Sequence, residues 1–212
     1  MINGLIAKKI GITSVFTPEG KYIAVTRLGV IPLTVTQVKS TETKDKYASV
    51  QVAGGHKKHL SKAVKSKLAK LKLDISPSFF KEFQLYDETI PAIGDQITVD
   101  SVFTVGESVS ITGTSKGRGF AGVIKRYGFQ RQPVSGGQSD RVRAPGAIGA
   151  QTPGKVLKGK KMPGHYGNKI KTVESMKIFS INPETQEILI AGSVPGSVNS
   201  YVTLTKRKQL KL

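Results

Sequence analysis

Cysteine is absent from this sequence of 212 residues. A chain without cysteine forms no disulfides, and it holds neither zinc nor an iron–sulfur cluster through thiolates. Long apolar runs are absent too, since none approaches the roughly 18 to 20 residues that a membrane-spanning helix requires. The opening MINGLIAKKIGITSVF has only a short, interrupted apolar stretch, which predicts a strand and not a secretory signal. These absences favour a protein of the reducing cytoplasm with no membrane partner.

Acidic residues are scarce. Fourteen Asp and Glu stand against thirty-three Lys and Arg, which gives a formal net charge of +19. This excess is larger than solubility requires and is typical of proteins that bind a polyanion, of which nucleic acid is the first to consider. The length suits one ordinary domain with additions, or two small domains.

The positive charge is concentrated in residues 115–169. This segment contains twelve basic residues, Asp140 as its single acidic residue, and twelve glycines. It lacks long apolar periodicity and so cannot build a core, which predicts an extended arm that is poorly ordered alone and becomes fixed on a partner. Glycine lets the backbone approach phosphate closely, Lys and Arg supply counter-charge, and aromatic rings supply stacking faces. The composition predicts an RNA-binding arm.

The rest of the chain has the pattern of a mainly β protein. Short alternating or β-branched runs include GITSVF, KYIAVTRLGV, LTVTQVKS, YASVQVAG, SVSITG, KTVESMKIFSI, EILIAGSV and YVTLT. Such spacing predicts a sandwich or a barrel. Neither half has enough strands to cover its own edges, so the two halves are expected to pair. We therefore predict a discontinuous β-barrel core from 1–55, 92–114 and 170–205, followed by a basic tail at 206–212.

A helical insertion is predicted over 56–91. Leu60, Val64, Leu68 and Leu71 recur at i, i+4, i+8 and i+11, which places them on one stripe of a helix. Lysines fill the opposite face, which is either a solvated surface or a contact with RNA phosphates. After this helix, an N-cap and first-turn proline predict a second short helix with three aromatic residues. The residues of this second helix are Ser76, Pro77, Phe79, Phe80 and Phe83.

Two short motifs resemble a metal site and a dinucleotide site. His56 and His59 have an H-x-x-H spacing, but no third ligand is near, so two exposed polar residues are expected. Gly117, Gly119 and Gly122 spell G-x-G-x-x-G. That fingerprint requires a following helix with the pyrophosphate at its N-terminus and an acid about 20 residues later.

The sequence after this glycine run contradicts a dinucleotide site, because Gly128 and Pro133 come before three turns of helix can form. The run Gly149–Lys155 matches the first seven positions of a P-loop, but Val156 stands where Ser or Thr would hold magnesium. No nucleophile with a His–acid pair is visible either. We predict no enzyme activity, no cofactor, no metal and no small-molecule substrate.

Three runs in this order carry a family resemblance: SKGRGFAGVIKRYGF, RAPGAIGAQTPGKVLKGKKMPGHYGN and VPG. They resemble the bacterial-type large ribosomal subunit protein three family. The likeness extends to GLIAKKIGIT and GDQITVD, so it covers essentially the whole chain.

The resemblance implies a structural constituent of the large ribosomal subunit in a bacterial-type cytoplasm. It implies a translation-factor-like closed β-barrel, with a small helical insertion beside it and a long glycine-rich basic extension threaded into RNA. The family binds large-subunit ribosomal RNA of the 23S type near its 3′ end, early in assembly, and extends its arm toward the peptidyl-transferase region. Large-subunit ribosomal proteins fourteen and nineteen are the implied protein neighbours.

The basic-arm motifs place a set of side chains on RNA. These are Lys116, Arg118, Phe120, Lys125, Arg126, Tyr127, Phe129, Arg131, Arg141, Arg143, Lys155, Lys158, Lys160, Lys161, His165, Tyr166 and Lys169. Each basic residue is expected to contact phosphate more often than a base. For Phe120 and Phe129, packing and base stacking stay open. Gln151 matches a glutamine that some bacterial members methylate on the side-chain amide.

The chain departs from the family pattern at the tip of the arm. Members often have S-H-G, H-R and P-G-S where this sequence has Ser135-Gly136-Gly137, Val142-Arg143 and Pro145-Gly146-Ala147. The alternative function is an enzyme that uses a glycine-rich loop on a nucleotide. Replacing Lys116 and Arg118 by alanine separates the two, because it weakens RNA binding in one case and abolishes nucleotide binding in the other. A third hypothesis is a free basic protein that acts outside the ribosome, but no feature of the sequence favours it.

Overall fold

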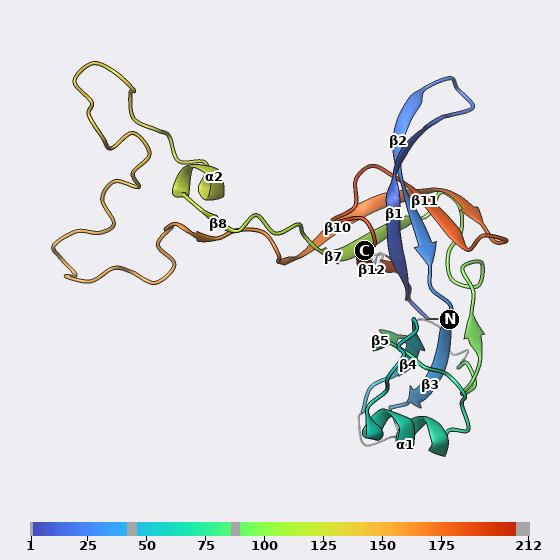
Figure 1. The fold of residues 1–212 in the computed structure, drawn as a ribbon. Coiled ribbons are helices and arrows are strands. Elements are labelled where there is room, and N and C mark those ends of the chain that lie inside the picture. The colour runs from blue at the N-terminus through green and yellow to red at the C-terminus, as the bar shows by residue number, and fades with distance from the viewer. Residues whose placement is uncertain (1, 42–45, 86–89, 207–212) are drawn as a thin grey trace. The chain divides into compact units, whose positions relative to one another are not determined.

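The structure is a computed structural model that describes residues 2–41, 46–85 and 90–206. It divides into two compact units. One consists of Met1–Thr114 and Ile170–Leu212, and the other of Ser115–Lys169. Strands dominate the first unit, whereas the second has little regular structure (Figure 1).

Six antiparallel strands of the first unit form a sheet that closes on itself through a ring of hydrogen bonds. Its order is β1-β12-β7-β10-β11-β2, and β2 pairs again with β1. The strands are β1 (Gly4–Phe16), β2 (Tyr22–Val30), β7 (Ser108–Thr114), β10 (Ile170–Asn182), β11 (Glu187–Ala191) and β12 (Tyr201–Lys206). In β7, β11 and β12 buried and more exposed residues alternate, as expected where one face of a strand packs inward. Closure leaves fewer exposed strand edges for unwanted pairing.

The segments on either side of residues 115–169 pair with each other, as the sequence predicted. β7 and β10 are neighbours, and their register begins with Thr114 opposite Ile170. The chain therefore leaves the closed sheet at one strand and returns to it at the adjacent strand.

A second sheet of four strands separates from the closed one. Its order is β5-β4-β3-β6, with β3 (Leu33–Lys39), β4 (Ser49–Gly54), β5 (Phe79–Gln84) and β6 (Gln96–Ile97). The predicted barrel core of 1–55, 92–114 and 170–205 extends beyond the closed sheet, because β3, β4 and β6 belong to the second sheet. Pro32 follows β2 and has no backbone N–H, so it cannot continue the ladder, and the chain turns out of the closed sheet there.

The predicted second short helix is also wrong, because its aromatic residues form β5. This strand pairs with β4 from Ser49 opposite Gln84 to Gly54 opposite Phe79. β4 offers an edge to pair with, and aromatic residues fit a half-buried pleated surface, so tertiary pairing overrides the cap-like Ser76-Pro77. Phe83 is buried as a result.

The first predicted helix is present as α1 (Lys62–Lys70), which is shorter than the predicted stripe. Leu68 is buried, and Val64 and Leu71 are partly buried, so the apolar stripe faces the protein. His56 and His59 are exposed ahead of the helix. Among the described residues, no group of three His, Asp or Glu side chains is placed to hold a metal ion.

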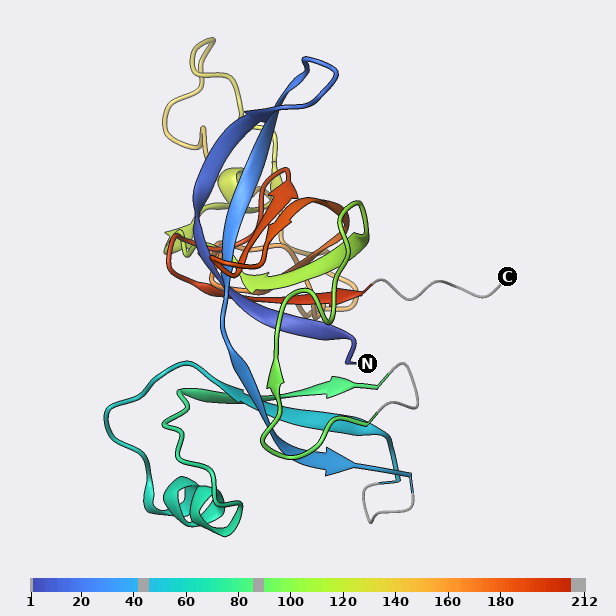
Figure 2. The same cartoon turned by 90° about the vertical axis from the view of Figure 1, so that its right-hand side faces the viewer.

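The two sheets share one hydrophobic core. Leu5, Leu28 and Ile111 of the closed sheet belong to the same buried cluster as Val50 and Val52 of the second sheet. The connection between β6 and β7 adds further apolar side chains to this cluster, namely Val99, Val102 and Phe103. Figure 2 shows the second sheet and α1 at one end of the closed sheet. The first unit is therefore a single packed body.

One buried cation connects β1 to the loop between β11 and β12. The Lys9 ammonium donates hydrogen bonds to the carbonyl oxygens of Val194 at 2.6 Å and Gly196 at 3.1 Å. Lys9 is 6% exposed. Its acceptors belong to the VPG run that marks the family resemblance. This run therefore takes part in holding the fold together.

β12 ends at Lys206, so the predicted basic tail at 206–212 lies outside the described residues after its first position. In the described part of the chain, no helix is both long enough and apolar enough to cross a membrane.

Candidate RNA-binding arm

The candidate site is the second unit, residues 115–169, which is called the arm below. Its two ends run antiparallel and are hydrogen-bonded to each other. Ser115 N donates to Lys169 O at 2.9 Å, and Arg118 N donates to Tyr166 O at 2.9 Å. Beyond these bonds, β8 (Phe120–Ala121) pairs with β9 (Gly164–His165), and Figure 1 shows these segments side by side. The first and last residues of the arm thus form a narrow two-stranded base.

The outgoing and returning segments of the arm approach each other so closely at this base that glycine is required. Gly167 has a φ of +74°, and a Cβ there would lie 2.2 Å from the Lys116 carbonyl oxygen. Backbone blocks this position, so a side chain could be accommodated only if the base opened. The glycine keeps the strands paired while the side chains of Lys116 and Arg118 stay exposed.

Gly167→Ala is expected to abolish the protection of the Arg118 and Tyr166 amides from hydrogen exchange, because the added methyl group cannot fit against the Lys116 carbonyl. Gly119→Ala is the matched control. Gly119 also has a positive φ, +64°, but no atom lies within 4 Å of its Cβ position. The control is expected to lose only about 1–2 kcal/mol of local stability from the backbone conformation. Equal protection in both variants would contradict the steric argument.

The arm has one short helix, α2 (Val123–Tyr127), after β8. Gly128 ends it in the left-handed conformation with a φ of +72°, and its N–H donates to Ile124 O at 2.9 Å. Ala121 and Val123 are the buried hydrophobic residues of the arm. A helix of five residues is much shorter than the one that the dinucleotide fingerprint requires. The run Gly149–Lys155 is likewise not followed by a helix in the structure.

Four predicted site residues meet around α2. Arg126 lies 5.0 Å from the Tyr127 ring centroid, and Lys161 lies 5.9 Å from the same centroid. The Phe129 ring is 6.3 Å from that of Tyr127. These distances are typical of cation–π and aromatic pairs. The cluster joins the outgoing part of the arm to its returning part.

Arg126 also makes a hydrogen bond inside the arm. Its Nη1 donates to the Met162 carbonyl at 2.7 Å, and a Cβ at Gly164 would lie 2.7 Å from the same nitrogen. Gly164 therefore leaves room for the guanidinium. The sequence did not predict these roles of Met162 and Gly164. The signal that points to them is the MPG run, which leads into β9. Part of the donor capacity of Arg126 is used to shape the arm.

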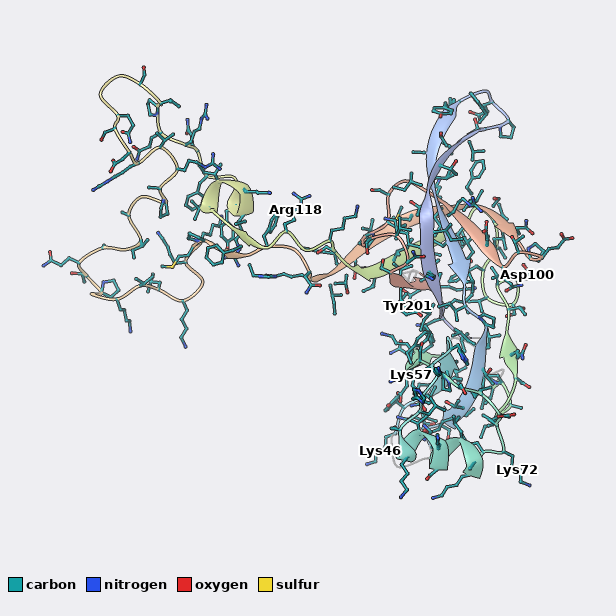
Figure 3. All side chains as sticks on the ribbon, viewed as in Figure 1. Lys46, Lys57, Lys72, Asp100, Arg118 and Tyr201 are labelled. Carbon is teal, nitrogen blue, oxygen red and sulfur yellow. The ribbon has the colours of Figure 1, made fainter. Side chains whose placement is uncertain are left out.

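The rings of Tyr166 and Phe120, both in the base of the arm, have different surroundings. The Arg118 guanidinium lies 5.5 Å from the Tyr166 ring centroid, while the Phe120 ring is 80% exposed. Phe120 and His165 are Cα partners across β8 and β9, and both are exposed. Figure 3 shows Arg118 on the chain leading to α2. Phe120 therefore presents a free stacking face, whereas Phe129 packs partly within the arm.

The remaining predicted site residues lie along the loop between α2 and β9 and at the base. Few backbone hydrogen bonds order this loop, among them Gln132 N to Val142 O at 3.1 Å and Lys160 N to Leu157 O at 3.3 Å. Gln151 is exposed. Besides Lys116 and Arg118, the exposed basic residues of α2, the loop and the base are Lys125, Arg131, Arg141, Arg143, Lys155, Lys158, Lys160, Lys161 and Lys169. The structure spreads these charges along the backbone instead of gathering them into a pocket.

Comparison with known proteins identifies the family. The family described as Ribosomal protein L3 matches residues 30–192, which is well over half of the chain. The chain belongs to the ribosomal protein L3 family. The family predicted from the arm motifs is therefore confirmed.

Similar proteins share nearly their full length with this chain. The large ribosomal subunit protein uL3 of Legionella pneumophila strain Corby is 43% identical over 207 residues, which cover 96% of this chain and 95% of the relative. The uL3 protein of Chromohalobacter salexigens is 44% identical over 206 residues, and that of Neisseria meningitidis serogroup C is 44% identical over 209 residues. The alignments cover 95% and 96% of this chain, and 96% of each relative.

Family membership fixes the class of function. The chain is a bacterial-type ribosomal protein of the large subunit, and it is not an enzyme. The glycine-rich runs that look like nucleotide sites belong instead to a ribosomal protein.

Proposed function

We propose that the arm anchors this chain in the large ribosomal subunit by binding ribosomal RNA along its length. The observation that supports this most directly is a unit of 55 residues, Ser115–Lys169, with a net charge of +11 and almost no buried apolar side chains. Such a chain does not hide its charge in a core, so its stable state requires a polyanion. Family membership supplies the polyanion as the RNA of the large subunit.

The positions of the arm residues support a role for each of them. The loop and base cations contact phosphate, because they are exposed and dispersed along the backbone. The exposed Phe120 ring stacks on a base, and the cluster around Tyr127 sets the direction of the loop. Gln151 stands exposed and accessible to a modifying enzyme, which supports it as a methylation candidate.

The finer parts of the proposal rest on the family. The chain binds 23S-type RNA near its 3′ end, joins the subunit early in assembly, and extends its arm toward the peptidyl-transferase region. Its protein neighbours are large-subunit ribosomal proteins fourteen and nineteen. The closed six-stranded sheet is the translation-factor-like barrel of the family, and its ring of antiparallel pairings supports that assignment.

Hydroxyl-radical footprinting of large-subunit ribosomal RNA with the full chain tests this proposal. We expect protections that cluster near the 3′ end and in the peptidyl-transferase region, and that disappear as salt rises because each phosphate contact releases counterions. In cell extracts we expect the chain to sediment with the large subunit in near-stoichiometric amount. Uniform weak protection over the whole RNA, or recovery only in the soluble fractions, would overturn the proposal.

A further inference from the structure

A second basic surface lies outside the arm, on α1 and the residues next to it. Residues 56–73 contain no acidic residue. They contain seven lysines, of which all but Lys67 are exposed: Lys57, Lys58, Lys62, Lys65, Lys67, Lys70 and Lys72. Figure 3 labels Lys57 and Lys72, which precede and follow α1 in the chain. This is a dense positive charge on a separate unit from the arm.

Within the described part of the chain, no ion pair neutralises this charge. The ion pairs found among the described residues use other basic residues, and α1 has no acidic residue in its first turn. Lys67 is directed to neutral groups: it donates to Gln51 Oε1 and lies 5.2 Å from the Phe80 ring centroid. Like charges three residues apart, as at Lys62 and Lys65, destabilise a helix by a few tenths of a kcal/mol. An external anion would remove this repulsion.

The geometry of α1 directs lysines of the helix outward. Leu68 is buried against the protein, so the opposite side of the helix faces outward. Lys62, Ser66 and Lys70 follow one another at intervals of four residues on that outward side, and Lys62 and Lys70 are about 12 Å apart along the axis. Small side chains between the lysines, such as Ser66, leave room for a charged backbone to approach.

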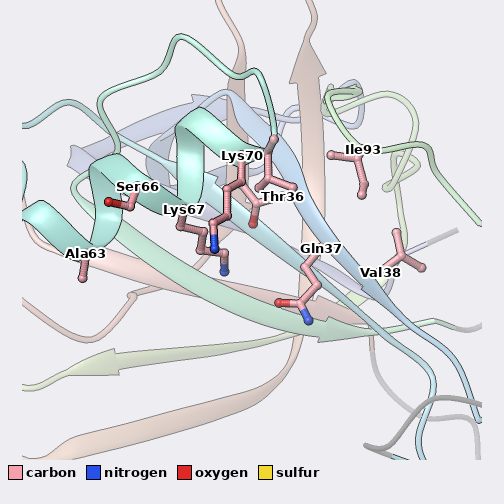
Figure 4. Close-up of a pocket in the computed structure, with 9 residues that line it drawn as sticks. Thr36, Gln37, Val38, Ala63, Ser66, Lys67, Lys70 and Ile93 are labelled. Atoms are coloured by element: carbon pink, nitrogen blue, oxygen red, sulfur yellow. The ribbon is translucent and has the colours of Figure 1, made fainter.

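A groove along the helix strengthens the positive potential. It lies between α1 and β3 and has a volume of about 500 Å³ (Figure 4). Lys67 and Lys70 line it together with Thr36, Gln37 and Ile93, and no acidic residue is among its lining residues. A concave surface with charges of one sign concentrates the electrostatic potential and attracts counter-ions.

We propose that this lysine face of α1 is a second RNA-binding surface, which contacts the sugar–phosphate backbone of large-subunit ribosomal RNA independently of the arm. The identity of the polyanion rests on the proposed function. Lysine is a flexible point charge and lacks the planar fork with which arginine reads bases or carboxylates, so the surface fits phosphate without base selection. A protein partner fits less well, because lysine is depleted at protein–protein interfaces.

Salt dependence tests the charge contribution in the full chain. One variant replaces four exposed lysines of this basic surface by glutamine: Lys58 ahead of α1, and Lys62, Lys65 and Lys70 within it. The matched control replaces four exposed lysines elsewhere in the first unit: Lys8, Lys46, Lys81 and Lys177. We expect the slope of log K against log salt for large-subunit ribosomal RNA to become shallower by about 3 in the first variant. A change no larger than that of the control would overturn the proposal.

The absence of cysteine allows a direct test of position. Ser66→Cys places a single thiol at the centre of the lysine face, and Ser139→Cys places one on the arm; each carries a tethered iron chelate that cleaves nearby RNA. We expect Ser66→Cys to cleave the ribosomal RNA at sites different from those of Ser139→Cys. Cleavage from residue 139 alone would overturn the second surface and leave the proposed function intact. Cleavage from residue 66 alone would contradict the role of the arm, and cleavage from neither would contradict both.

Discussion

Replacing four exposed arm lysines by glutamine is expected to weaken binding to large-subunit ribosomal RNA by about 10²- to 10³-fold at 0.15 M salt. The four lysines are Lys116, Lys155, Lys158 and Lys160. Each phosphate contact that is lost removes the release of its counterions, so the slope of log K against log salt becomes shallower by about 3. Filter binding of the full chain over a range of salt concentrations measures both quantities.

These four positions are chosen because their replacement spares the arm itself. Arg118, Arg126 and Lys161 contact aromatic rings within the arm, and their loss would alter its shape as well as its charge. The control is the first-unit variant used above, in which Lys8, Lys46, Lys81 and Lys177 are replaced. Affinity that falls equally in both variants would show that binding follows net charge alone and that the arm has no special part in it.

Lys9→Met is expected to lower the free energy of unfolding by about 2–5 kcal/mol. Methionine keeps most of the apolar stem but has no ammonium, so the carbonyl oxygens of Val194 and Gly196 lose a charged donor inside the fold. Hydrogen bonds from a charged group contribute more than neutral ones, and buried acceptors that lose their partner carry a desolvation cost. Urea unfolding monitored by circular dichroism measures the change.

Lys8→Met is the matched control for this prediction. Lys8 is the neighbour of Lys9 on β1, but its side chain is exposed, so its replacement is expected to change stability by less than about 0.5 kcal/mol. If Lys9→Met is as stable as the control, the buried ammonium does not hold the loop between β11 and β12. If the urea slope changes together with the midpoint, the variant has altered the unfolded or native ensemble as well.

The Lys9 contact changes how the VPG run is understood. The run was one of three that carried the family resemblance, and the other two lie in the arm. Val194 and Gly196 accept hydrogen bonds from Lys9, and Gly196 has a φ of +102° that an L side chain rarely adopts. This run therefore contributes to the fold through its backbone, whereas the arm runs present side chains outward.

The family and the chemistry of the arm could be predicted from the sequence. Charge and glycine content are sums over residues and do not depend on which segments meet. The motifs around Gly117 and Gly164 are long and specific enough to indicate the ribosomal family without a structure. Pairing between the two halves of the chain was also predictable, because neither half has enough strands to cover its own edges. That β7 and β10 are neighbours came from the structure.

The division of the strands between two sheets was not predictable in this way. An alternating run indicates a strand, but it does not indicate the strand with which it pairs. The residues Phe79–Gln84 follow a helix-like start at Ser76 and Pro77, and only the edge of β4 decides that they are extended. Local propensity is weaker than a full set of ladder hydrogen bonds and the burial of Phe83, so tertiary contacts determine this segment.

In the arm, the sequence by itself determined which residue types are present to bind RNA, as we propose, whereas the tertiary structure decided which of them also build the arm. Arg126 and Lys160 are indistinguishable as cations in the sequence, yet Arg126 bonds the Met162 carbonyl and Lys160 lies exposed in the loop. The same holds for Lys8 and Lys9, which are adjacent in β1 and face opposite sides of the sheet. The physical reason is that charge belongs to a residue, whereas burial and hydrogen-bond partners come from segments distant in the chain.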